Sequence, residues 1–168
     1  PGGFMIEGQV DHQRFNQIFQ QLIERHESLR TSFELKEDEP VQIVHDSVDF
    51  NLQSLTGEGA DLEDIIEEFI QPFDLGQAPL LRAGLVDLGD EYLFIWDMHH
   101  IISDGASMNI LIKDFLSLYQ GDNLKSLPVQ YKDYTAWQQE FIESERMVEE
   151  EEYWLEIFKE SVPELDIV

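Results

Sequence analysis

Four segments of the chain repeat apolar residues every three or four positions, which is the spacing of an amphipathic helix. They cover residues 11–23, 62–70, 106–119 and 131–159, and the last is long enough for two helices. Asp11 is placed to cap the first helix, and Pro72 follows the end of the second. The third should end near Gly121, and the residues expected to face inward from it are Met108, Leu111, Ile112, Phe115 and Leu118.

Between these helices, apolar and β-branched residues predict four strands, at residues 30–35, 41–45, 81–88 and 91–99. Gly89 and Asp90 form a turn dipeptide, so the last two strands should pair as a hairpin. The strand at 91–99 is mostly apolar on both faces, which is typical of a central strand covered by helices. This mixture of strands and helices predicts an α/β fold, or an α+β sandwich.

The charge balance is strongly acidic, with 36 Asp and Glu against 10 Lys and Arg and a net charge of −26. Such a surface repels nucleic acid and anionic membranes, so neither is expected as a partner. The absence of cysteine excludes disulfides, thiolate metal sites and cysteine nucleophiles, and it agrees with a cytoplasmic location. The sequence has no apolar run long enough for a membrane span and no signal-peptide pattern at its start. Its first residue is proline rather than methionine, so we expect a segment of a longer polypeptide.

The segment with candidate chemistry is HHIISDG, residues 99–105, between the central strand and the third helix. His100 can exchange a proton near neutral pH, and Gly105 allows close approach to the backbone. The amides that start the following helix favour negative charge at the same place. Each residue also has a purely structural interpretation: Asp104 as an N-cap, Gly105 as a turn residue, the histidines as packing residues. His99 and His100 should point to opposite faces, which argues against a metal site shared by the two.

Four motifs together resemble the condensation domains of nonribosomal peptide synthetases, within the chloramphenicol acetyltransferase-like superfamily. HHIISDG is similar to the family's HHxxxDG signature. The other three motifs are RHESLRTSF (25–33), QPFDLGQAPLLR (71–82) and YKDYTAWQ (131–138). A complete domain of this family is much longer, so the resemblance implies that residues 1–168 form the N-terminal lobe. That lobe would be a mixed sheet covered by helices, and the C-terminal lobe would lie outside this chain.

The resemblance also implies a reaction, the formation of a peptide bond between two substrates carried as thioesters. The amine of an acceptor would attack the thioester carbonyl of a donor. His100 would take the proton of the amine, or hold the amine and the tetrahedral intermediate by hydrogen bonds. The amide near Gly105 would stabilise the oxyanion.

The neighbours of these two residues are expected to be structural. His99 would support the loop, and Asp104 would form an ion pair with an arginine, with Arg25 and Arg30 as the main candidates and Arg82 as a third. No cofactor or metal would be bound directly, because the substrates arrive on the phosphopantetheine arms of an upstream and a downstream carrier protein. The other expected partners are the C-terminal lobe and an adenylation domain of the same synthetase.

Three other interpretations remain open. An epimerization domain has the same fold and the same HHxxxDG signature, although RHESLRTSF and YKDYTAWQ favour condensation. A coenzyme A-dependent acyltransferase would leave the paired histidine and the other three motifs unexplained. A non-catalytic module that only docks carrier proteins would be free to lose His100 or Gly105, and both are present.

Overall fold

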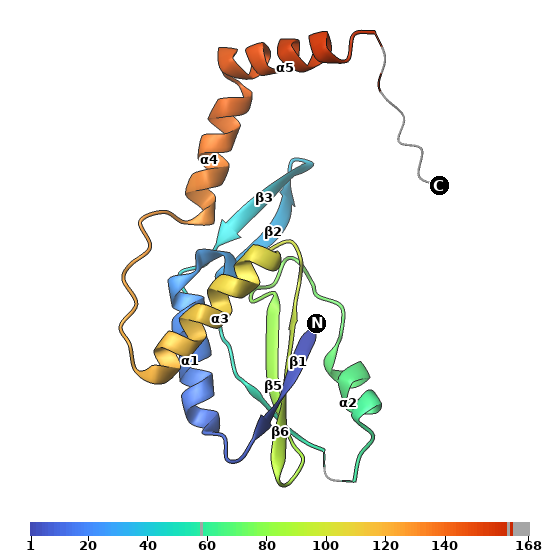
Figure 1. Cartoon of the computed structure of the whole chain (residues 1–168), viewed down its shortest axis with the longest axis vertical. Helices are drawn as coiled ribbons and strands as arrows, with labels where there is room; N and C mark the ends of the chain where they lie inside the picture. The colour runs from blue at the N-terminus through green and yellow to red at the C-terminus, as the bar shows by residue number, and fades with distance from the viewer. Residues whose placement is uncertain (58, 161, 163–168) are drawn as a thin grey trace. The chain divides into compact units, whose positions relative to one another are not determined.

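The computed structural model describes residues 1–57, 59–160 and 162 (Figure 1). Within the chain two compact units are distinguished, residues 1–130 and residues 131–168. No helix among the described residues is long and apolar enough to cross a membrane.

The first unit is built on a mixed sheet of four strands, in the order β1-β6-β5-β4. In that order the strands are Gly2–Glu7, Glu91–Met98, Leu81–Asp87 and Gln53–Thr56. Neighbouring strands are antiparallel except for β4, which runs parallel to β5. In the β5–β6 register, Arg82 lies directly opposite Asp97. β6 is therefore a central strand, as its two apolar faces predict.

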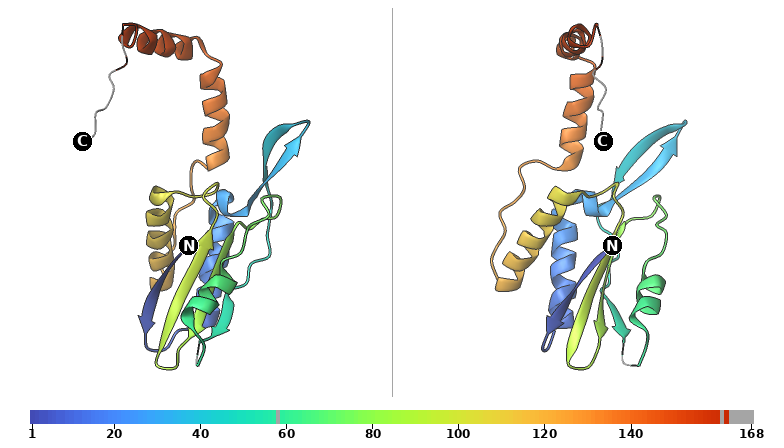
Figure 2. Two further views of the ribbon diagram at one scale, coloured as in Figure 1. Left: turned by 90° about the vertical axis from the view of Figure 1, so that its right-hand side faces the viewer. Right: turned by 45° about the vertical axis from the view of Figure 1, so that its right-hand side comes forward.

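Helices cover both faces of this sheet, which explains why β6 is apolar on both sides (Figure 2). The helices on one face are α1 (His12–Arg25) and α3 (Gly105–Gln120), and α2 (Leu62–Phe69) is on the other. The larger core cluster joins α1 to the sheet, with α3 packed against it, and includes Phe15, Phe19, Leu22, Leu81 and Phe94. A smaller cluster lies under α2 and consists of Phe69, Val86 and Ile95.

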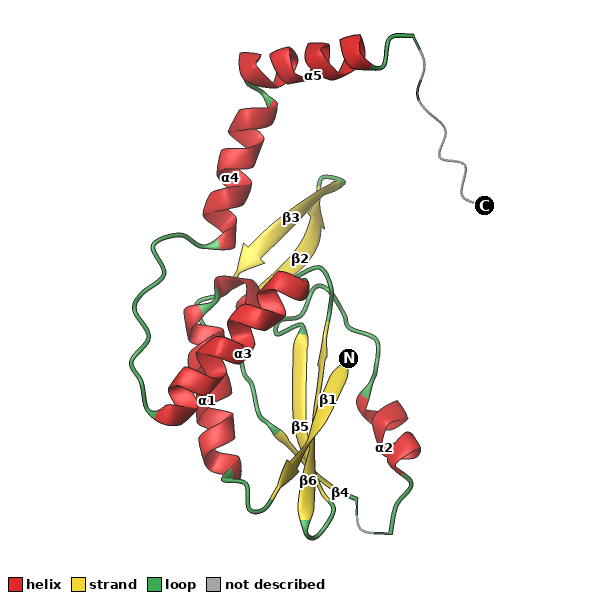
Figure 3. Cartoon of the chain, in the orientation of Figure 1, coloured by secondary structure: helices red, strands yellow, loops and turns green. Residues whose placement is uncertain are grey.

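A separate two-stranded sheet follows α1, after the short 3-10 helix η1 (Glu27–Arg30) (Figure 3). Its strands are β2 (Thr31–Lys36) and β3 (Glu39–Val44). The two residues between them, Glu37 and Asp38, have φ angles of 53° and 67°. Two positive φ values in a two-residue loop are the geometry of a type I′ hairpin turn, which suits Asn and Gly better than these acidic residues.

The second unit contains two helices, α4 (Tyr131–Ile142) and α5 (Glu145–Ile157), as the aromatic pattern predicts. None of the residues in either helix is buried. Successive aromatic rings of α4 contact one another with centroids 5.6 to 6.1 Å apart, from Tyr131 through Tyr134 and Trp137 to Phe141. This unit therefore has an apolar stripe but no core of its own among the described residues.

Most predicted elements of the first unit are confirmed, and three details differ. Strands β1 and β4 were not predicted, because β1 has glycines at two of its six positions and β4 is only four residues long. Ile112 was expected to face inward but is 49% exposed. The buried residue of α3 is Asp114, whereas Leu111, Phe115 and Leu118 are partly buried against the larger core cluster, as expected.

Candidate active site

The HHIISDG segment lies between the end of β6 and the start of α3, and backbone hydrogen bonds fix its first four residues. The His99 amide donates to the Leu80 carbonyl at 3.0 Å, which extends the sheet one residue beyond β6. The Ile102 amide then donates to the His99 carbonyl at 3.2 Å and closes a turn. His100 is therefore held in a tight turn at the edge of the core.

His99 is a structural residue by its contacts. Its Nδ1 accepts a hydrogen bond from the Ile101 amide at 3.1 Å. A neutral imidazole that accepts at Nδ1 has its proton on Nε2, so this bond selects one tautomer. The ring packs edge-on against Phe73, with centroids 6.2 Å apart and planes at 89°.

His100 is exposed and lines a pocket of about 230 Å³ at the start of α3. The pocket is also lined by Pro1, Trp96, Met98, Ser103, Asp104, Gly105 and Met108. Trp96 and Met98 come from the β6 face opposite to that of Asp97, in agreement with the expected divergence of the two histidines. The imidazole of His100 is thus available to a substrate, while that of His99 is used by the loop.

Asp104 caps α3. Its Oδ1 accepts hydrogen bonds from the Ser107 amide at 2.8 Å and from the Ser107 hydroxyl at 2.6 Å. These bonds, the hydroxyl one first, hold the pKa of the Asp104 carboxyl below its ordinary value of 3.8, with smaller help from the Ala106 amide and the nearby His100. The carboxylate is therefore ionised at neutral pH and fixes the first turn of the helix.

The expected ion pair between Asp104 and an arginine is wrong. Each candidate arginine has another carboxylate partner: Arg25 with Asp114 at 2.9 Å, Arg30 with Glu27 at 3.4 Å and Arg82 with Asp97 at 3.0 Å. Among the residues that the structure describes, no arginine is within ion-pair distance of Asp104. The physical reason is local, because Ser107 already satisfies the exposed Asp104 carboxylate, whereas the three guanidinium groups have partners that are mostly shielded from water.

Gly105 is the first residue of α3, and the fold does not require a glycine there. A Cβ built at this position would meet nothing within 4 Å, and the residue has no left-handed backbone conformation. The missing side chain instead leaves space open where the pocket meets the helix start. The Gly105 amide, as the first of the helix, has no intrahelical acceptor and is available to a developing negative charge.

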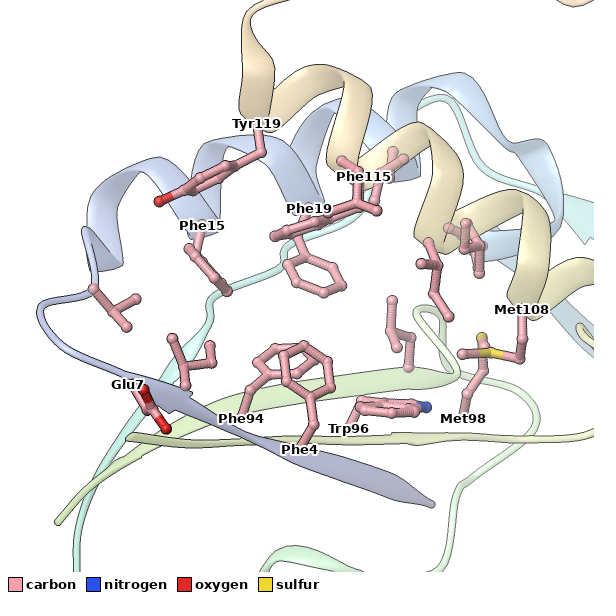
Figure 4. Close-up of a pocket in the computed structure, with 18 of the residues that line it drawn as sticks. Phe4, Glu7, Phe15, Phe19, Phe94, Trp96, Met98, Met108, Phe115 and Tyr119 are labelled. Atoms are coloured by element: carbon pink, nitrogen blue, oxygen red, sulfur yellow. The ribbon is translucent and has the colours of Figure 1, made fainter. Parts of the chain in front are cut away.

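Figure 4 shows a second, apolar cavity of about 360 Å³. It lies between the β1–β6 side of the sheet and helices α1 and α3. Three residues, Trp96, Met98 and Met108, line both cavities. Sequence reasoning did not assign them to the site. The only available signals were the alternation along β6 and the position of Met108 one turn into α3.

The described part of the chain contains no cluster of three or more His, Cys, Asp or Glu side chains that could hold a metal ion. The groups that face the site are the His100 imidazole, the first amide of α3 and the apolar side chains of Trp96, Met98 and Met108.

All 168 residues match the family model of the condensation domain. The chain belongs to the condensation-domain family. It is 50% identical over 168 residues to gramicidin S synthase 2 of Aneurinibacillus migulanus, and 48% identical over 167 residues to tyrocidine synthase 3 of Brevibacillus parabrevis. In each case the match covers 99% of this chain but only 4% and 3% of the relative. This condensation-domain chain therefore spans a small part of the length of the relatives that it matches.

Solved structures of related domains have the same fold as this condensation-domain chain. The epimerization domain from the third module of tyrocidine synthetase B superposes with a TM-score of 0.81 at 24% identity, over 99% of this chain and 42% of that one. The starter condensation domain of rhizomide synthetase has a TM-score of 0.77 at 19% identity, over 94% of this chain and 41% of that one. The predicted mixed α/β fold is confirmed.

Proposed function

We propose that this chain contributes the histidine-bearing lobe of a domain that forms amide bonds between two carrier-bound thioesters. The proposal rests on the different environments of the two adjacent histidines. The ring of His99 is bound within the loop, whereas His100 is exposed in a pocket beside the first amide of α3. Membership in the condensation-domain family supports this assignment.

In the proposed reaction, the α-amine of the acceptor attacks the thioester carbonyl of the donor. A C–N bond forms and an oxyanion develops, toward which the Gly105 amide can donate. The C–S bond then breaks, the donor leaves the sulfur of its carrier arm as an acyl group, and the new amide stays on the acceptor. His100 removes the proton lost by the amine, and the departing thiolate takes up a proton.

Proton removal by His100 is only one of the effects that would accelerate amide formation, because the alignment of the two substrates also contributes. General-base catalysis contributes about 10²–10⁴-fold, and the alignment of two tethered reactants can contribute up to about 7–11 kcal/mol. A measurable rate without His100 is therefore compatible with the proposal. A rate equal to that of the unmodified domain is not.

The proposed partners are an upstream and a downstream carrier protein, which deliver the substrates on phosphopantetheine arms. The remaining lobe and an adenylation domain would belong to the same cytoplasmic synthetase. The small share of each relative that this chain covers is in accord with such an assembly. The net charge of the chain, −26, favours partners with basic docking patches over nucleic acid.

The test uses the complete domain that contains this chain, with a donor and an acceptor loaded on two carriers. His100→Ala should lower the single-turnover rate of amide formation by about 10²-fold or more, with an unchanged melting temperature. His99→Asn, which keeps an acceptor for the Ile101 amide, should lower it less. Equal losses accompanied by unfolding would contradict the assignment.

The same preparation separates the alternatives. An epimerization domain would exchange the α-proton of a single carrier-bound substrate with deuterated solvent and would form no amide. A docking module would bind both carriers with no reaction, and His100→Ala would change neither affinity.

A further inference from the structure

We propose that Arg82 and Phe73 are positioning residues for His100, and that they act through the ring of His99. This inference rests on the proposed function for its effect on rate, but not for its structural test. Neither residue lines the His100 pocket. They contact Asp97 and His99, on the face of β6 opposite to the face that lines the His100 pocket.

Arg82 is held in place by three different groups. Its Nη1 donates to Asp97 Oδ2 at 3.0 Å, across the β5–β6 register. The Asp97 side chain is only 8% exposed, so the arginine neutralises a buried carboxylate. Its Nη2 donates to the Pro72 carbonyl at 3.0 Å, and its Nη1 also donates to that of Gln71. The guanidinium therefore attaches the segment before β5 to the sheet.

The same guanidinium supports Phe73. Its Cζ lies 3.8 Å from the centroid of the Phe73 ring, in the arrangement of a cation–π contact. Phe73 in turn meets the His99 ring edge-on. The Arg82 guanidinium is planar, and its bonds to two carbonyls and a carboxylate fix its orientation. The Phe73 ring is therefore held between the fixed guanidinium and the ring of His99.

The His99 ring then determines the turn. Its Nδ1 accepts from the Ile101 amide, and its carbonyl accepts from the Ile102 amide. His100 is the residue enclosed by these two bonds. Rotation of the His99 ring breaks the Ile101 bond and frees the backbone on which the His100 imidazole is mounted. A displacement of about 1 Å at a reacting group can cost about 10²-fold in rate.

Two substitutions in the complete domain test whether Arg82 and Phe73 affect the rate of amide formation. Arg82→Lys keeps a positive charge near Asp97 but loses the planar face, and Phe73→Leu keeps apolar volume but loses the ring. Each should lower the single-turnover rate about 10-fold or more, with little change in the concentration of acceptor carrier at half-maximal rate. Val86→Ala is the matched control, because Val86 is fully buried on the same β5 face and is remote from the turn. It should lower the melting temperature at least as much and leave the rate unchanged.

A double-mutant cycle tests the route through His99. In a His99→Asn background, Phe73→Leu should have no further effect, because the ring that it supports is absent. Independent, multiplicative losses would show that Phe73 acts elsewhere and would overturn the proposal.

A structural measurement keeps this inference distinct from the proposed function. Deuterium exchange of the Ile101 amide should become faster in Arg82→Lys and Phe73→Leu but not in Val86→Ala. Unchanged protection in the first two variants would overturn the positioning role whatever the enzyme activity. Failure of the proposed function would be seen separately, as an unaltered rate in His100→Ala.

Discussion

At the scale of single residues, the site depends on the alternation of side chains along an extended chain. Asp97 and His99 face the α2 side of the sheet, where Arg82 and Phe73 bind them. His100 faces the other side and is exposed. Two chemically identical side chains therefore have different roles because they are one position apart at the end of a strand.

A first prediction concerns Gly105. Gly105→Ala should leave the melting temperature unchanged or slightly raised, because alanine is a better helix former and nothing lies within 4 Å of the added methyl group. The methyl group would occupy the space in front of the helix-start amide, so amide formation in the complete domain should fall about 10-fold or more, as for a lost oxyanion donor.

Gly121→Ala is the control for this prediction. Gly121 ends α3 with a φ of 90°, a conformation that alanine adopts only with strain. This variant should lose about 1–2 kcal/mol of stability and keep its rate. A Gly105→Ala variant that is destabilised to the same extent but fully active would show that the glycine serves the fold.

At the scale of elements, a buried carboxylate joins α1 to α3. Asp114 Oδ2 accepts from Arg25 Nε at 2.9 Å and from His26 Nε2 at 3.0 Å. Burial is the main cause of a lowered pKa at His26, and its hydrogen bond with Asp114 opposes this effect only in part. At neutral pH, His26 is therefore an uncharged donor, and Arg25 supplies the charge that balances Asp114.

This arrangement predicts a pH dependence of folding. The unfolded chain binds a proton at His26 near pH 6.5, whereas the folded chain resists protonation. The stabilising contribution is thus fully present above pH 6.5 and decreases as the pH falls below it. Urea unfolding at pH 7.5 and at pH 5.5 should show a larger loss of stability for the unmodified chain than for His26→Gln. An equal loss in both proteins would assign the effect to other groups.

A second prediction at this scale concerns the β2–β3 turn. Asp38 has a φ of 67°, which glycine adopts without strain. Asp38→Gly should stabilise the chain by about 0.5–1 kcal/mol in chemical unfolding. Lys36→Gly, two residues earlier within β2, should instead destabilise it by about the same amount. Destabilisation by Asp38→Gly would mean that the acidic turn has contacts that outweigh its strain.

The elements that could be predicted are those with a strong local pattern. The faces of β6 indicated a central strand, and the signature before α3 indicated the place of His100. The arginine partners could not be deduced, because each of Arg25, Arg30 and Arg82 has several acidic residues within possible reach and the choice depends on burial. Phe73 was part of a motif, but its contact with His99 brings together residues 26 positions apart through the sheet, which no local spacing reveals.

At the scale of the whole molecule, the two units differ in how they satisfy their apolar residues. Every residue of both core clusters lies within residues 1–130. In α4 and α5, large side chains such as Trp137 and Trp154 are each 55% exposed. The first unit therefore contains the buried apolar groups needed for cooperative folding, and the described part of the second unit has no such cluster.

We predict that residues 1–130 fold without residues 131–168. The truncated chain should unfold in a single cooperative transition, with a melting temperature within a few degrees of that of residues 1–168. Calorimetry and near-ultraviolet circular dichroism of the two chains would measure this. A broad, non-cooperative transition in the shorter chain would show that its core needs the second unit.

The position of β1 has a consequence for handling the chain in solution. β1 is an outer strand of its sheet, and Phe4 and Met5 on it are 49% and 46% exposed. The free hydrogen-bonding groups of such a strand can recruit a strand from another molecule and start polymerisation. The net charge of −26 makes two copies of the chain repel each other. Dissolved salt screens this repulsion, with a screening length of about 10 Å at 0.1 M and about 3 Å at 1 M. Ionic strength thus governs whether copies of this chain stay apart long enough for the sheet edge to remain unpaired.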